Sequence, residues 1–93
     1  MTIGERLREA RMRRELDIAD AEAYTKIRAK YLRALENDEF GMLPDSTLAK
    51  TFLRTYSEYL GLDAQLLIEE YRAQHEPRGE GDVPAFAPRL ARE

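Results

Sequence analysis

The stretch TKIRAKYLRALENDEFGMLPDSTLAKTFLRTYSEYLGLD, residues 25–63, decides the fold of this chain. It contains a basic amphipathic segment, a short loop that ends at Leu43-Pro44, and an aromatic-rich segment that ends at Gly61. In both segments apolar residues recur every three or four positions, which is typical of helices that bury one face. The pattern therefore predicts two helices, over about 28–37 and about 46–60.

Capping residues predict three more helices around this stretch. Thr2 and Glu5 have the spacing of a capping box, in which each residue satisfies a free backbone N–H group of the first turn. Asp17 and Asp63 are acidic residues at the expected starts of two further helices, where a carboxylate accepts backbone hydrogen bonds. We therefore expect helices over about 3–14, about 18–24 and about 63–75.

Apolar residues outside these periodic patterns indicate how the core closes. The loop over 38–44 contains Phe40, Met42 and Leu43, which are too apolar to be solvated and are expected to cover one end of the core. The last helix is expected to bury one side, made of Leu66, Leu67, Ile68 and Tyr71.

The chain changes character after residue 75. Residues 77–93, PRGEGDVPAFAPRLARE, contain three Pro and two Gly and have no apolar periodicity. This composition predicts a flexible tail or linker over 76–93. The sequence therefore indicates one all-α domain of five helices over 1–75, followed by a disordered tail.

Composition excludes several functional classes. The 93 residues carry a net charge of −3 and contain no Cys, so no thiolate can bind a metal or act as a nucleophile. No apolar run approaches the roughly 20 residues that span a bilayer, and no signal peptide precedes the first helix. His75 is the only His, and a charged His at a helix end usually serves the helix dipole. We therefore expect a protein with no catalytic residue, no metal and no cofactor.

Several motifs together resemble a known family. IGERLREAR, TKIRAKYLRALENDEF, the Leu43-Pro44 pair and FLRTYSEYLGLD occur in this order and resemble the N-terminal cytoplasmic domain of the RodZ family over roughly residues 2–72. The resemblance implies a five-helix, lambda-repressor-like helix-turn-helix fold. It also implies an adaptor that binds the actin-like filament protein MreB in bacterial cell-shape control.

The resemblance places the filament contact on the helix over 46–60. Phe52 and Tyr56 are four residues apart, so they lie on one face of the helix, and aromatic residues are favoured interface anchors. Lys50 and Arg54 are expected at the polar rim of the contact. The alternative for both aromatics is burial, since a domain of this size needs large residues in its core.

The resemblance also bears on location and assembly. RodZ chains continue through a linker into a transmembrane helix, and this chain ends within the linker. It is therefore either a fragment or a relative without the anchor, and any membrane contact would come through a segment absent from this sequence. We expect a cytoplasmic domain, at the inner face of the membrane if the chain is longer. No apolar seam stands out, which favours a monomer.

Duplex DNA is the alternative partner, because the second helix of a helix-turn-helix motif lies in the major groove. Candidate contacts around the start of the helix over 28–37 are Lys26, Arg28, Ala29, Lys30 and Arg33. Arg and Lys can pair with guanine. The alternative for these cations is the solvated face of an amphipathic helix.

The preceding helix opposes the DNA alternative. This helix should cross the phosphate backbone, yet it carries Asp17, Asp20 and Glu22, whose charge opposes binding to phosphate. Ile18 stands where DNA-binding relatives often have Gln. We therefore rank the XRE-type, DNA-binding regulator second.

Overall fold

A computed structural model describes residues 1–75, which fold into five α-helices and one short 3₁₀ helix. The elements are α1 (Ile3–Arg13), α2 (Ile18–Thr25), α3 (Ala29–Glu36), η1 (Phe40–Met42), α4 (Ser46–Leu60) and α5 (Ala64–His75). The predicted all-α, five-helix fold is confirmed, and each predicted helix boundary lies within one residue of the observed one. The predicted flexible tail lies outside the described residues.

The expected caps set the helix starts. Thr2 and Glu5 form a complete capping box at the start of α1, and Asp63 accepts a hydrogen bond from the Leu66 backbone N–H. Asp17 caps α2 as predicted, and it also forms a second capping box with Asp20, which was not predicted. These contacts satisfy N–H groups that have no partner inside the helix.

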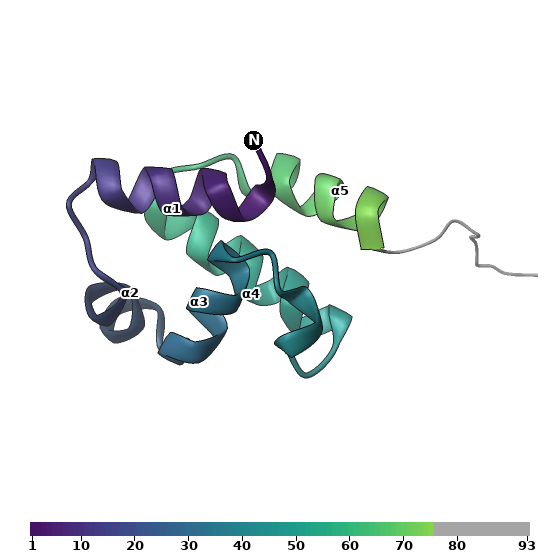
Figure 1. Cartoon of the computed structure of the whole chain (residues 1–93), viewed down its shortest axis with the longest axis horizontal. Helices are drawn as coiled ribbons and strands as arrows, with labels where there is room; N and C mark the ends of the chain where they lie inside the picture. The colour runs from purple at the N-terminus through teal and green to yellow at the C-terminus, as the bar shows by residue number, and fades with distance from the viewer. Residues whose placement is uncertain (76–93) are drawn as a thin grey trace, which may run out of the picture.

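Helix α4 is the central element of the fold (Figure 1). It packs against α5, against α1 and against both helices of the helix-turn-helix pair, α2 and α3. Its inner face contributes Ala49, Leu53, Tyr56 and Leu60 to a single core. The other buried apolar residues of this core are Ile3, Leu7, Ala10, Ala21, Ile27, Leu32, Leu35, Phe40, Leu43, Leu67, Ile68 and Tyr71.

Gly4 allows α1 to approach the end of α3 closely. A Cβ atom built on Gly4 would lie 2.4 Å from the Glu36 carbonyl oxygen, so no larger residue fits without a backbone shift. Asp38 completes this junction, because its carboxylate accepts hydrogen bonds from the Gly4 backbone N–H at 2.8 Å and the Thr2 hydroxyl at 2.6 Å. The start of α1 is therefore capped by a residue from the far end of α3.

Two residues predicted to be buried are exposed. Met42 is 69% exposed and Leu66 is 49% exposed, whereas their neighbours Phe40, Leu43 and Leu67 are buried as expected. The short η1 turn directs Phe40 and Leu43 inwards and leaves Met42 outside. These differences show that local apolar content sets the direction of a side chain less firmly than helix geometry does.

Candidate partner-binding surface

Tyr56 is buried and forms part of the core. Its side chain is 0% exposed, and its hydroxyl donates a hydrogen bond to Glu36 Oε2 at 2.5 Å. Burial, together with this hydrogen bond to a carboxylate, raises the pKa of Tyr56 above its ordinary value. Tyr56 was predicted either as an interface anchor or as a core residue. The first alternative is corrected, because the side chain is buried and the hydroxyl is held inside the domain.

Glu36 is the buried carboxylate that holds Tyr56. It is 4% exposed, and its carboxylate accepts two hydrogen bonds from Arg11, from Nε at 2.7 Å and from Nη2 at 3.1 Å. The hydrogen bond with Glu36 raises the pKa of Arg11. Arg8 lies near the same carboxylate, with Nε 3.6 Å from Oε1. This network joins α1, α3 and α4 and fixes the orientation of α4.

The sequence carries a signal for the burial of Glu36, which was not among the predicted site residues. Glu36 follows Leu32 by four residues, so it lies on the inner face of its helix. A carboxylate in that position needs a cationic partner to be buried. The Arg-rich segment of α1 supplies this partner through Arg11.

Aromatic side chains line the seam between α4 and the helix-turn-helix pair. Phe52 is half-buried, and its ring centroid lies 5.5 Å from that of Tyr31 on α3. Tyr59 is half-buried, and its ring centroid lies 4.8 Å from that of Tyr24 on α2, which is 74% exposed. We call these four residues, Tyr24, Tyr31, Phe52 and Tyr59, the aromatic stripe. It offers a partly exposed apolar surface across three helices.

Charged side chains lie close to two residues of this stripe, Tyr31 and Tyr59. The Lys30 ammonium lies 5.0 Å from the centroid of the Tyr31 ring, within the range of a cation–π interaction. Partial burial raises the pKa of Tyr59, and the negative charge of Asp20 acts in the same direction. Tyr24 and Tyr59 were not among the predicted contact residues, and the spacing of Tyr59 seven residues after Phe52 could have indicated a shared face.

Lys50 and Arg54 lie on the other border of α4. Both line a groove between α4 and α5, away from the aromatic stripe. Lys50 is half-buried and Arg54 is exposed. The two cations predicted for the polar rim therefore lie on one side of α4, and the aromatic stripe lies on the other.

The predicted DNA contacts cluster at the start of α3. Lys26, Arg28, Lys30 and Arg33 are exposed, and Ala29 is half-buried. Lys26 ends α2 in the left-handed conformation, with φ of 66°.

Acidic groups occupy the helix ends that DNA phosphates would approach. The backbone N–H of Ala29 donates to the carboxylate of Glu22 at 2.9 Å, so α2 caps α3. At the start of α2, Asp17 and Asp20 are exposed and hydrogen-bonded to each other's backbone. The hydrogen bond that the Asp20 backbone N–H donates to the Asp17 carboxylate lowers the pKa of Asp17.

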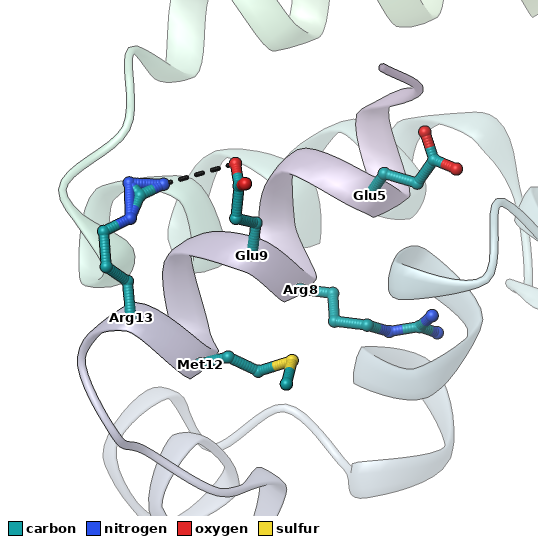
Figure 2. Close-up of a pocket in the computed structure, with 5 residues that line it drawn as sticks. All are labelled: Glu5, Arg8, Glu9, Met12 and Arg13. Atoms are coloured by element: carbon teal, nitrogen blue, oxygen red, sulfur yellow. Dashed lines mark hydrogen bonds and ion pairs between the residues drawn. The ribbon is translucent and has the colours of Figure 1, made fainter.

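A hollow lies along α1 (Figure 2). Its volume is about 510 Å³, and it is lined by Glu5, Arg8, Glu9, Met12 and Arg13. All five residues come from one helix, and Arg13 pairs with Glu9 at 3.4 Å (Figure 2). This is an open helix face that no second element encloses. Within residues 1–75, no acidic or histidine cluster could hold a metal ion, and no helix is long and apolar enough to cross a membrane.

Comparison with known proteins identifies the family. Residues 6–67 match the model of a helix-turn-helix domain family. The cytoskeleton protein RodZ of Streptococcus pneumoniae is 36% identical over 70 residues, 75% of this chain. The uncharacterised membrane protein YmfM of Bacillus subtilis is 37% identical over 57 residues, 61% of this chain. The present chain spans only 25% and 20% of these two proteins, respectively.

A solved structure shows the same arrangement of helices. YmfM of Staphylococcus aureus, described as a candidate DNA-binding membrane protein, has a TM-score of 0.74 and 28% sequence identity to this chain. The match covers 80% of this chain and 90% of the solved one. The match over residues 6–67 and these likenesses show that the chain belongs to the helix-turn-helix domain family and contains a RodZ-like helix-turn-helix domain.

Proposed function

We propose that this domain is a non-enzymatic adaptor that binds an MreB-like actin filament protein through the outer surface of α4. The observation that carries the proposal is the aromatic stripe, because interface hot spots are enriched in aromatic side chains surrounded by polar residues. The likeness to RodZ, which is named a cytoskeleton protein, supports a cytoskeletal partner. In this proposal the domain acts as a monomer in the cytoplasm, at the inner face of the membrane if it is part of a longer chain.

Phe52 takes the anchoring role that the sequence assigned jointly to Phe52 and Tyr56. It is half-buried, so its ring contributes an edge to the surface while Tyr31 supports the ring from α3. Tyr59 and Tyr24 extend the same surface towards α2. An anchor supported in this way loses little conformational entropy on binding, which favours affinity.

Co-sedimentation with filaments of an MreB-like protein tests this proposal. Phe52→Ala combined with Tyr59→Ala should weaken binding at least tenfold, the loss expected when hot-spot residues are truncated. Met12→Ala is the matched control, since Met12 is an exposed apolar residue on α1, outside the stripe. Circular dichroism of each variant must show a folded domain. Equal binding by the wild type and the folded double variant would contradict the proposal.

DNA binding through α3 is the second candidate function. It is favoured by the exposed cations Lys26, Arg28, Lys30 and Arg33 and by the likeness to a candidate DNA-binding YmfM. It is opposed by the carboxylates of Asp17, Asp20 and Glu22 at the ends of α2 and α3. Fluorescence anisotropy with random duplex DNA distinguishes the DNA-binding regulator from the filament adaptor. Binding with a steep salt dependence, lost in Arg28→Ala plus Lys30→Ala, would favour the regulator.

A further inference from the structure

The groove between α4 and α5 is cationic. On α4 it is lined by Thr47, Lys50, Thr51 and Arg54, and on α5 by Ile68 and Arg72. The α4 residues follow the i, i+3, i+4, i+7 spacing of one helical stripe. Ile68 is buried, so it forms an apolar floor between the charged side chains.

The positive charges of residues 45–75 are concentrated in this groove. Residues 45–75 contain three Lys/Arg and five Asp/Glu, and all three cations line the groove while none of the five acids does. Within residues 1–75, Arg54 and Arg72 form no ion pair or hydrogen bond with the protein. Like charges gathered on an acidic segment repel each other unless an anion lies between them, so the arrangement is complementary to a negative group.

The donors and the size of the groove define the class of ligand. Arg guanidinium groups pair with carboxylates through two parallel hydrogen bonds, and the Thr47 hydroxyl can add a further donor. The Thr51 hydroxyl already donates to the Thr47 carbonyl oxygen at 3.0 Å. The groove has a volume of about 170 Å³, below the roughly 300–1,000 Å³ of sites that enclose a small molecule or cofactor. It therefore suits one or two carboxylate side chains.

We infer that the α4–α5 groove, with Lys50, Arg54 and Arg72, receives acidic side chains of the protein partner. This inference rests on the proposed function, because the groove and the aromatic stripe are the two borders of the same outer surface of α4. A partner that covers this surface would meet aromatic residues on one side and cations on the other. The stripe would supply apolar contact, and the groove would set the register by charge.

The first experiment tests the chemistry of the groove without the filament. A hexaglutamate peptide is titrated into the ¹⁵N-labelled protein, and backbone amide shifts are followed by NMR. We expect shifts around residues 47–54 and 68–72 that disappear in the variant Lys50→Gln, Arg54→Gln, Arg72→Gln. The control variant removes the same charge from another surface, through Lys26→Gln, Arg28→Gln and Lys30→Gln. It should retain the shifts around residues 47–54 and 68–72. Shifts confined to residues 26–33, or absent altogether, would overturn the inference.

The second experiment uses the filament and separates the two proposals. The groove variant should bind MreB-like filaments roughly tenfold more weakly at low salt, with the difference shrinking at high salt as charges are screened. If the groove variant binds as the wild type does at both salt concentrations, the inference fails and the adaptor function stands. If the wild type does not bind filaments at all, the adaptor function fails, and the inference that rests on it fails too.

Discussion

Removal of the Tyr56 hydroxyl tests the assignment of this residue to the core. Tyr56→Phe retains the ring and deletes the hydrogen bond to the buried Glu36 carboxylate, which is 2.5 Å long. Hydrogen bonds to charged groups contribute about 1.5–3 kcal/mol to the stability of a fold. In the Tyr56→Phe variant, Glu36 keeps its two hydrogen bonds from Arg11. We therefore expect the free energy of unfolding to fall by an amount near the lower end of this range, about 1.5–2 kcal/mol.

Urea unfolding followed by circular dichroism measures this loss. In a domain of this size each kcal/mol shifts Tm by roughly 4–8 °C, so thermal unfolding should move by about 6–16 °C. Tyr24→Phe is the matched control, because Tyr24 is exposed. Loss of its hydroxyl should lower the free energy of unfolding by less than about 0.5 kcal/mol. A Tyr56→Phe variant as stable as the wild type would refute the account of the Glu36 network.

The same reasoning changes how a Tyr56→Ala result is interpreted. Loss of a buried aromatic ring costs about 3–5 kcal/mol, comparable with the roughly 5 kcal/mol that a small domain has in total. This variant would lose partner binding by unfolding. Phe52→Ala, at a half-buried position, is the substitution that reports on the surface.

Three further outcomes follow from the packing and the caps. Gly4→Ala should destabilise the domain by about 1–3 kcal/mol in urea unfolding, since its Cβ would lie 2.4 Å from the Glu36 carbonyl oxygen; an unchanged midpoint would contradict this close approach. Glu22→Gln should cost about 1 kcal/mol, because a neutral amide caps α3 less strongly than a carboxylate, and a gain in stability would disprove the cap. The pKa of Tyr56 is raised in the folded state, so its contribution is complete below about pH 10 and is lost as the pH rises further. Stability should therefore fall above pH 10, less steeply in Tyr56→Phe, and identical pH profiles would count against the raised pKa.

The helices could be predicted from sequence because their signals are local. Thr2, Asp17 and Asp63 identified helix starts, and Gly61 identified the end of α4, where the structure has φ of +80°. Each of these signals involves residues within a few positions of one another. Long-range contacts gave no such local signal. The cap that Asp38 provides for α1 and the closeness of Gly4 to α3 depend on tertiary packing.

The candidate surface could be predicted only in part for the same reason. The spacing of Phe52 and Tyr56 placed them on one side of α4, but it could not decide which of them faced the core. Tyr56 turned inwards because Glu36 and Arg11 come from two other helices. The pairing of Tyr24 with Tyr59 joins residues 35 positions apart, and the α4–α5 groove likewise joins two helices.

Site-specific photo-crosslinking tests the central claim most directly. A photoreactive phenylalanine analogue replaces Phe52 on α4 in one version of the protein and Lys26, beside α3, in another. Each version is irradiated separately with MreB-like filaments and with duplex DNA. The account predicts a filament crosslink from position 52 and none from position 26, and no DNA crosslink from either. A DNA crosslink from position 26, with no filament crosslink from position 52, would contradict it.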